Sequence, residues 1–374
     1  HNLHSIKSLI GPDVGTMAII KADAYGHGAI QCAHAAIKEQ VDYIGVGIIQ
    51  EGIELRENGI TSPILILGGI YPNEIEDLIK YNLSTSLSNS VIASAISKKA
   101  KQANQSVGVH IKIDTGMGRL GVQPDALTKL MDNVITCKNL KINGLFTHLS
   151  SADEEDPERT NRQISIFSNV LKKIHTTNFS KMISESDHIL FHSANTAGLL
   201  RFPESRFDLV RPGISLFGSF PSPTVASVFD SLTNENKATK LRPVMNWKTK
   251  IIQIQTLRKG VPVSYGGSYV TQNDGTRIAT IPVGYADGLS RRLSNNMELL
   301  VKETRVKQVG TICMDMCLID ITNLPDVTMG EEVVIFGSQG KGQIKVEELA
   351  TKADTIPYEI LCGIGKRVPR IYIS

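Results

Sequence analysis

The sequence lacks the features of a disulfide-stabilised, metal-binding, membrane-spanning or nucleic-acid-binding protein. Its five cysteines are an odd number in a chain of 374 residues, and none forms a Cys-x-x-Cys pair. Cys313 and Cys317 flank Met-Asp-Met, but no ligand cluster follows at zinc spacing, so we expect no metal site. The longest apolar runs are strand-sized, whereas a membrane span needs roughly 20 apolar residues. The net charge is only +3 and the basic residues are scattered, so we expect neither a membrane nor a nucleic-acid partner.

No signal region is visible where the sequence begins. The chain starts at His1 without an initiator Met, and Leu3, Ile6, Leu9 and Ile10 follow an amphipathic helical spacing. This pattern is typical of a helix entered partway, and we expect that an upstream segment has been removed or left out. The compartment is therefore only weakly constrained, and a cytoplasmic location is the expectation.

Short β-rich runs alternate with helical stretches over the first 215 residues. Alternation of this kind indicates a parallel sheet, and eight strands suit a closed, TIM-like α/β barrel. A doubly wound sheet is the alternative, but its Gly-x-Gly-x-x-Gly turn is missing. The predicted strands are Met17–Ile20, Tyr43–Ile48, Pro63–Leu67, Leu83–Ser86, Val109–Asp114, Ile142–Thr147, Ile189–Phe191 and Phe207–Val210.

The pattern changes towards the C-terminus. Residues 219–240 are rich in Ser, Pro, Thr and Asn and predict an exposed linker. We therefore expect two domains, a barrel over residues 1–235 and a mainly β domain over residues 236–374. The strands predicted in the second domain are Trp247–Gln255, Arg277–Pro282, Leu299–Val301, Val309–Met314, Cys317–Ile321, Glu332–Phe336 and Arg370–Ile373.

Polar side chains follow the predicted barrel strands at their C-terminal ends, where the reactive groups of such barrels lie. Lys21 ends the buried run Met17–Ile20, and we expect burial to lower the pKa of its amine and make it nucleophilic. A lysine that merely extends its amine to water is the alternative, and spacing alone favours it. The rim is cationic and suits an anionic ligand such as a phosphate; it comprises Lys21, Arg119, His148, His192, Asn195, Thr196, Arg211 and Gly213.

The segment Lys21–Gly28 reads Lys-Ala-Asp-Ala-Tyr-Gly-His-Gly, and with it the sequence resembles the alanine racemases, whose pyridoxal-phosphate lysine stands in this motif. The resemblance covers nearly the whole chain, in order and in both predicted domains. Further matching blocks are Asp114–Gly121, Thr147-His148, Arg211–Ile214, Ser264–Gly266, Gly284–Gly288, Ile312–Asp315, Tyr358-Glu359 and Arg367–Arg370.

The resemblance implies an enzyme that interconverts L-alanine and D-alanine with pyridoxal 5'-phosphate, supplying D-alanine for cell-wall peptidoglycan. Lys21 would hold the cofactor and act as the base on one face of the substrate's Cα. Tyr265 would be the base on the opposite face, reaching the site from the partner subunit of a homodimer. Two proton carriers are needed because a single base returns the proton to the side it left. Taken alone, Tyr265 beside two glycines would be a turn residue.

The resemblance also implies how the cofactor is held. Arg211 would face the pyridine nitrogen of the cofactor. Because arginine stays protonated, it does not hand a full proton to the pyridine ring, which is then a weaker electron sink than it would be beside a carboxylate, and this limits side reactions. Gly213 and Ile214 would give backbone N–H groups to the phosphate. Thr196 stands where serine is common and keeps the hydroxyl. The cofactor-binding set is completed by Tyr25, Arg119, His148, Asn195 and Tyr358.

Other roles follow from the same resemblance. Arg119 and the backbone N–H of Met314, from the other subunit, would place the substrate carboxylate. Lys112 matches a lysine that is carbamylated in some family members, with a simple salt bridge as the alternative. His148 would lie beside the Arg211 guanidinium, and His192 beside the partner-chain tyrosine, although either also fits a rim histidine. Tyr285 would narrow the approach to the site, and Cys313 and Asp315 would support it.

Three alternatives stay open at this point. A racemase of wider range would accept serine or basic amino acids. A decarboxylase of the same architecture would be expected to place an acidic residue at the pyridine nitrogen, where Arg211 stands. A non-enzymatic pyridoxal-phosphate carrier protein would share the lysine but not the β domain with Tyr265 and Met314.

Overall fold

The computed structural model describes residues 1–175, 189–235 and 239–373. The chain divides into two compact units. The first comprises His1–Ala24, Gly28–Leu216 and Phe220–Leu241. The second comprises Tyr25–His27, Phe217–Ser219 and Arg242–Ser374, so two short segments of the N-terminal half group with the C-terminal part.

Eight parallel strands form the sheet of the first unit, in the order β7-β6-β5-β4-β3-β2-β1-β8. The two edge strands meet, because the Asp208 N–H donates to the Phe191 carbonyl at 3.0 Å and the Asp208 carboxylate accepts the Phe191 N–H at 2.7 Å. The predicted α/β barrel is confirmed. Its strands are β1 (Gly15–Ile19), β2 (Tyr43–Val46), β3 (Ile64–Ile66), β4 (Ser84–Leu87), β5 (Val107–Lys112), β6 (Leu140–Phe146), β7 (Leu190–His192) and β8 (Leu209–Val210).

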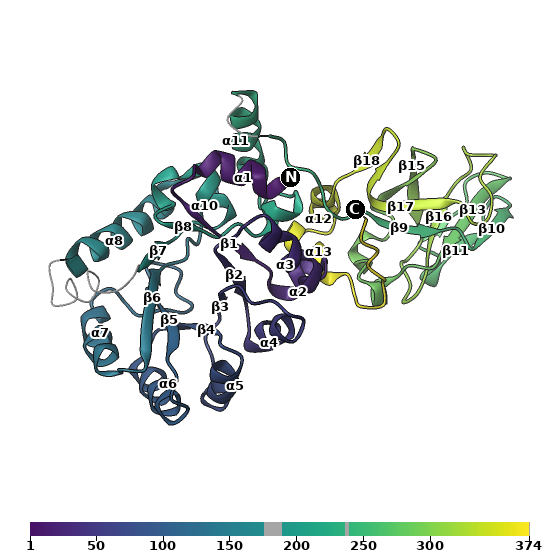
Figure 1. The fold of residues 1–374 in the computed structure, drawn as a ribbon. Helices are drawn as coiled ribbons and strands as arrows, with labels where there is room; N and C mark the ends of the chain where they lie inside the picture. The colour runs from purple at the N-terminus through teal and green to yellow at the C-terminus, as the bar shows by residue number, and fades with distance from the viewer. Residues whose placement is uncertain (176–188, 236–238, 374) are drawn as a thin grey trace. The chain divides into compact units, whose positions relative to one another are not determined.

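Helices surround these strands on the outside (Figure 1). In α6 the buried residues recur every three or four positions, at Ala93, Ile96 and Ala100, and Asn89 caps the first turn. The helices are α1 (Asn2–Ile10), α2 (Lys21–Gly26), α3 (Ala29–Lys38), α4 (Ile49–Glu57), α5 (Ile75–Lys80), α6 (Ser90–Gln102), α7 (Leu127–Thr136), α8 (Glu158–His175), α10 (Thr196–Arg201) and α11 (Pro223–Asn234).

The predicted linker over residues 219–240 is wrong, because much of it is helix α11. The Ser222 hydroxyl accepts the Val225 N–H at the N-terminus of this helix, and a proline occupies its first turn. Val225 and Phe229 are buried in one cluster with residues of α1 and α10. A pair of apolar residues four positions apart therefore anchors the helix to the barrel, although its composition is that of a loop.

The second unit is mainly antiparallel, with one sheet in the order β10-β13-β16-β15-β14-β17-β18, β9 beside β17, and a small β11-β12 pair. Its strands are β9 (Trp247–Lys250), β10 (Gln253–Leu257), β11 (Pro262–Val263), β12 (Tyr269–Val270), β13 (Thr276–Ile281), β14 (Glu298–Val301), β15 (Thr304–Val309), β16 (Cys317–Asp320), β17 (Glu332–Gln339) and β18 (Gly342–Ile344). Two helices follow, α12 (Val346–Lys352) and α13 (Pro357–Gly363).

Three strand predictions in this unit differ from the structure. Trp247–Gln255 is split into β9 and β10. The predicted strand Val309–Met314 is wrong. The strand of this region, β15, lies before it and ends at Val309, because Gly310 takes a φ of +78° that ends the extended run. Arg370–Ile373 forms no strand, and Ile371 and Ile373 are exposed there.

Candidate active site

Lys21 stands two residues after the end of β1, at the start of a left-handed helical turn. Ala22, Asp23, Ala24 and Tyr25 all have φ between 52° and 54°, a conformation that costs roughly 1–2 kcal/mol per non-glycine residue. Side chains from the barrel hold the turn: the Glu51 carboxylate accepts the Ala22 N–H at 2.6 Å, and the Asp23 carboxylate accepts the N–H of residue 29 at 2.7 Å. Strain of this kind at a strand end is typical of a functional site.

The Lys21 side chain is exposed in the single chain, although Ile19 and Ile20 before it are buried. The expectation that burial desolvates this amine is therefore wrong for one chain on its own. Lys21 lies close enough to Lys112 and His148 for its charge to lower the pKa of both, so Lys112 is a second cation near Lys21.

Lys112, at the end of β5, is buried within this cluster of cations. Burial lowers the pKa of its amine to about 8, and the charges of Arg211, Arg119 and Lys21 add to the effect. Asp114 opposes the shift, but its carboxylate already accepts the backbone N–H groups of residues 116, 117 and 118. No salt bridge to Lys112 is present within the described ranges, so the alternative of a simple ion pair is not met. The cluster has a surplus of positive charge and suits an anion.

Arg211 follows β8 and is 3% exposed. Its Nη2 donates to the Thr147 carbonyl at 2.8 Å and the Ser193 carbonyl at 2.9 Å, and lies 3.4 Å from Nδ1 of His148. Its Nη1 lies 2.7 Å from Nδ1 of His192. Burial lowers the pKa of the guanidinium to about 9, which still leaves it charged at neutral pH. Among the described residues its partners are all neutral, and its Nε–H takes part in none of these bonds.

The two rim histidines, His148 and His192, both contact Arg211, whereas this contact was predicted for His148 only. His148 lies beside the guanidinium as expected. His192 is fully buried and both its ring nitrogens are engaged, by Arg211 and by Nδ1 of His110 at 2.9 Å, so its predicted role beside a partner-chain tyrosine stays a prediction and would have to be indirect. His110 was not predicted as a site residue. Its position inside the apolar strand β5 gave no motif, and only the fold brings it beside His192.

The residues predicted to bind a phosphate fall into two groups, one in each unit. In the first unit the Gly213 N–H donates to the Thr196 hydroxyl at 3.0 Å, Thr196 lies 3.2 Å from the Ser215 hydroxyl, and Ile214 begins a short 3₁₀ turn. In the second unit the rings of Tyr25 and Tyr358 are in contact, with centroids 5.7 Å apart.

Asn195 has a structural task in the barrel. Its side-chain oxygen accepts the Gly198 N–H at 2.9 Å and so caps α10, while its side-chain nitrogen donates to the Leu149 carbonyl at 3.3 Å. Because both ends of the amide are engaged, the predicted contact of Asn195 with a cofactor would have to come from its backbone.

The predicted site residues of the second unit include three exposed side chains. Tyr265 is 73% exposed in the turn Tyr265–Gly267, Met314 is 52% exposed and Tyr285 is 45% exposed. The Tyr285 N–H donates to the Cys313 carbonyl at 3.0 Å, which fixes the two segments together. Asp315 is paired with Arg367 at 2.8 Å, in keeping with a supporting role. Large exposed side chains in one area are typical of a surface that binds another molecule.

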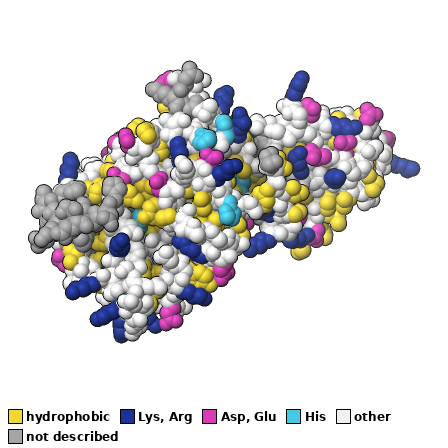
Figure 2. Space-filling model, viewed as in Figure 1, with side chains coloured by type: hydrophobic (Ala, Val, Ile, Leu, Met, Phe, Trp, Pro, Cys, Tyr) yellow, Lys and Arg dark blue, Asp and Glu magenta, His cyan; other side chains and the backbone are white. Residues whose placement is uncertain are grey.

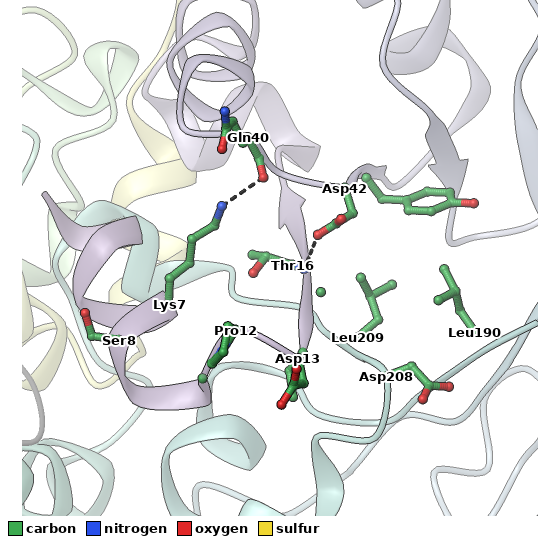
Figure 3. A pocket seen from close by; sticks show the side chains of 14 residues that line it. Lys7, Ser8, Pro12, Asp13, Thr16, Gln40, Asp42, Leu190, Asp208 and Leu209 are labelled. Atoms are coloured by element: carbon green, nitrogen blue, oxygen red, sulfur yellow. Dashed lines mark hydrogen bonds between the residues drawn. The ribbon is translucent and has the colours of Figure 1, made fainter. Parts of the chain in front are cut away.

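A pocket of the barrel unit lies at the end of the barrel opposite to Lys21 and Arg211. It has a volume of about 880 Å³ and is lined by residues at the N-terminal ends of the strands, among them Thr16, Asp42 and Asp208 (Figure 3). Lys7 donates to the Gln40 carbonyl at its edge, at 2.8 Å. Lys21 and Arg211 follow the opposite, C-terminal ends of β1 and β8, so this pocket is separate from the candidate site.

Two further features of the described ranges concern metal ions and membranes. Within them no three His, Cys, Asp or Glu side chains gather to form a metal site. None of the helices described there is both long and apolar enough to cross a membrane. On the face seen in Figure 2, Lys and Arg side chains are scattered among Asp and Glu and form no continuous basic patch.

Comparison with known proteins identifies one family over nearly the whole chain. Residues 1–221 match the family "Alanine racemase, N-terminal domain" and residues 244–372 match "Alanine racemase, C-terminal domain". The alanine racemase of Halothermothrix orenii is 41% identical over 371 residues, which cover 99% of this chain and 93% of that protein. Alanine racemase 1 of Caldanaerobacter subterraneus subsp. tengcongensis is 39% identical and covers 100% and 92%.

Solved structures give the same result. The alanine racemase of Clostridium difficile 630 has a TM-score of 0.86 at 38% identity, covering 98% of this chain and 91% of that one. The alanine racemase of Bacillus anthracis with bound L-Ala-P has a TM-score of 0.88 at 32% identity, covering 100% and 92%. The match extends through both parts of the chain, as the ordered sequence blocks indicated. The chain therefore belongs to the alanine racemase family of isomerases.

Proposed function

We propose that this enzyme interconverts L-alanine and D-alanine with pyridoxal 5'-phosphate, in the cytoplasm, and that the D-alanine supplies cell-wall peptidoglycan. The observation that carries the proposal is the setting of Lys21. It follows β1 in a strained turn and lies in a cluster of cations with Lys112 and Arg211. Family membership supports the reaction, and the positive charge of the cluster supports an anionic cofactor.

The chemistry of the donors around Lys21 fits this cofactor. The Thr196 hydroxyl and the backbone N–H groups of Gly213 and Ile214 would hold its phosphate, and Arg119 its phenolate oxygen. The Nε–H of Arg211 would face the pyridine nitrogen. When bound, the cofactor withdraws electrons from the substrate's Cα and makes its hydrogen acidic.

The side chains of this chain would then move the proton. The Lys21 amine would take or return it on one face of Cα, and the Tyr265 phenol on the other. Arg211 would stay charged and donate without giving up its proton, because even its lowered pKa lies well above that of a pyridine nitrogen. A decarboxylase of this architecture is disfavoured, since it would be expected to place an acidic residue at the pyridine nitrogen, where Arg211 would stand with only neutral partners in the described part of the chain.

The same proposal includes a homodimer with shared active sites. Tyr265 and Met314 are exposed on the second unit, as expected for groups that serve a neighbouring subunit. Met314 would donate its backbone N–H to the substrate carboxylate alongside Arg119, and Tyr285 would narrow the approach.

Racemisation by the purified protein tests the proposal. We expect D-alanine from L-alanine at a rate far above that with serine, lysine or arginine, and borohydride reduction should fix the cofactor on Lys21. The matched control is the exposed Lys138, since Lys138→Ala should keep the activity that Lys21→Ala loses. A reduced adduct on another lysine would overturn the site, and absence of alanine racemisation would overturn the reaction.

A further inference from the structure

Three buried side chains form a line of hydrogen bonds inside the barrel. Nη1 of Arg211 lies 2.7 Å from Nδ1 of His192, and Nε2 of His192 lies 2.9 Å from Nδ1 of His110. Arg211 is 3% exposed and both histidines are fully buried. The line leads from the candidate site, through the last residue of β7, to the middle of β5.

The direction of the donors along this line follows from arginine chemistry. A guanidinium has only N–H donors, so Nδ1 of His192 must be the acceptor. A neutral His192 then carries its proton on Nε2 and donates it to Nδ1 of His110. His110 in turn must carry its own proton on Nε2. One charged group thereby fixes the tautomers of two imidazoles.

Both imidazoles are held in the neutral form. Burial, followed by the positive charge of Arg211, lowers the pKa of His110 to about 3 and that of His192 well below its usual value. Two other titratable groups of the described residues lie near the rings: the phenol of Tyr43 is edge-on to His110, and Lys112 lies over the Phe146 ring that stacks on His192. No carboxylate bonds either imidazole within the described ranges.

The surrounding barrel is shaped to hold His110. Gly144 on β6 leaves room for the ring, because a Cβ there would lie 2.4 Å from Nδ1 of His110. The ring packs edge-on against Tyr43, while Phe146 stacks on His192 with centroids 4.8 Å apart. Nε2 of His110 has no hydrogen-bond partner among the described residues. An apolar side chain would avoid this unsatisfied donor, so packing alone gives no reason for a histidine.

We propose that His110 is a positioning residue for the reaction proposed above, on which this inference rests. By accepting the Nε2–H of His192, it holds the His192 ring in the orientation and tautomer, set by Arg211, that present Nδ1 to the guanidinium. The guanidinium is thereby held in one orientation, with neutral acceptors on both terminal nitrogens. Its charge and its Nε–H then stay directed at the ligand.

The first test is nitrogen NMR of ¹⁵N-histidine-labelled protein, with and without added pyridoxal 5'-phosphate. We expect His110 and His192 to be neutral Nε2–H tautomers that do not titrate from mildly acidic to alkaline pH. His34→Gln, on the exposed side of α3, is the control and should remove only its own signal. A protonated imidazole at either position, or an Nδ1–H tautomer of His192, would overturn the proposal.

The second test compares two substitutions of His110. His110→Leu removes the acceptor, and we expect kcat to fall about tenfold with little change in KM or unfolding temperature, as for the loss of one oriented hydrogen bond. His110→Asn keeps an acceptor close to the place of Nδ1 and should restore most of kcat and the His192 signal. Unchanged kcat and an unchanged His192 signal in His110→Leu would refute the role.

Failure of this inference can be told from failure of the proposed function. If the parent protein lacks racemisation, the proposed function is wrong, whereas the tautomers are read from the labelled protein without turnover. If His110→Leu does not fold, His110→Asn and the spectra of the parent protein still test the proposal. A charged or Nδ1-protonated His192 would contradict the line of hydrogen bonds from Arg211 through His192 to His110.

Discussion

Nζ of Lys112 lies 5.3 Å from the centre of the Phe146 ring, and Arg211 lies 5.4 Å from the same ring. A ring shared by two cations stabilises both through its negative face, but it removes no net charge. The lysine amine therefore stays in a positive environment, and burial, followed by these neighbouring charges, lowers its pKa to about 8. A neutral amine of this kind is nucleophilic near physiological pH.

We predict that Lys112 is carbamylated by CO₂. The nitrogen attacks CO₂, a proton is released, and the resulting anion is stabilised by Arg211 and Arg119. Because the pKa is lowered, the reactive neutral amine predominates above about pH 8, rather than above the pH at which free lysine loses its proton. Carbon NMR with ¹³C-bicarbonate should show one carbamate that grows as pH rises through this range. A signal that persists in Lys112→Arg would place the carbamate elsewhere.

The left-handed turn after Lys21 predicts a stabilising substitution. Ala22 has φ 52° and is exposed, so Ala22→Gly should relieve steric strain and raise the free energy of unfolding by about 0.5–1 kcal/mol, after the greater chain entropy of glycine is counted. Ala95→Gly, within the right-handed helix α6, is the control and should lower it by about 1 kcal/mol. Denaturant titration measures both, and a loss of stability in Ala22→Gly would contradict the strained conformation.

The eight barrel strands were predictable because each is a short β-rich run followed by a polar or glycine-rich end. The His110–His192 contact was not, since it joins strands that are distant in sequence and depends on the barrel closing around them. The helix α11 was missed because its Ser and Thr residues resemble a loop, although the spacing of Val225 and Phe229 was a signal. Strand β15 was missed because of the charges of Arg305 and Lys307. These two exposed residues flank the buried Val306, and this alternation was the available signal for a strand.

Helix α11 predicts a large effect of a core substitution. Phe229 is 1% exposed and packs against Phe220, with ring centroids 5.2 Å apart. Phe229→Ala should lower the free energy of unfolding by about 3–5 kcal/mol, whereas Ser227→Ala on the exposed side of the helix should change it by less than about 0.5 kcal/mol. Equal, small effects in thermal or denaturant unfolding would mean that this segment behaves as a linker.

The shared active site predicts complementation between two inactive chains. Lys21→Ala and Tyr265→Ala should each be inactive, and subunit exchange between them should restore about a quarter of the parent activity, since half of the dimers then hold one intact site. Lys21→Ala mixed with the double variant Lys21→Ala/Tyr265→Ala should stay inactive. No recovery after confirmed exchange, or full activity in a sedimenting monomer, would contradict sites built from two chains.

The central claim is that Lys21 and Tyr265 act as separate bases on opposite faces of Cα. Tyr265→Phe keeps the ring but removes the proton carrier, so racemisation should fall by about 10²–10⁴-fold in both directions. Equilibrium fixes the ratio of the two overall rates, and the difference between the bases must be sought in isotope exchange.

The most direct measurement is exchange of the Cα hydrogen of each alanine enantiomer with solvent deuterium in Tyr265→Phe, followed by proton NMR. The account predicts that the enantiomer deprotonated by Lys21 still exchanges, while the other exchanges far more slowly. Equal exchange of L-alanine and D-alanine in this variant would contradict it, because a different group would then serve the second face.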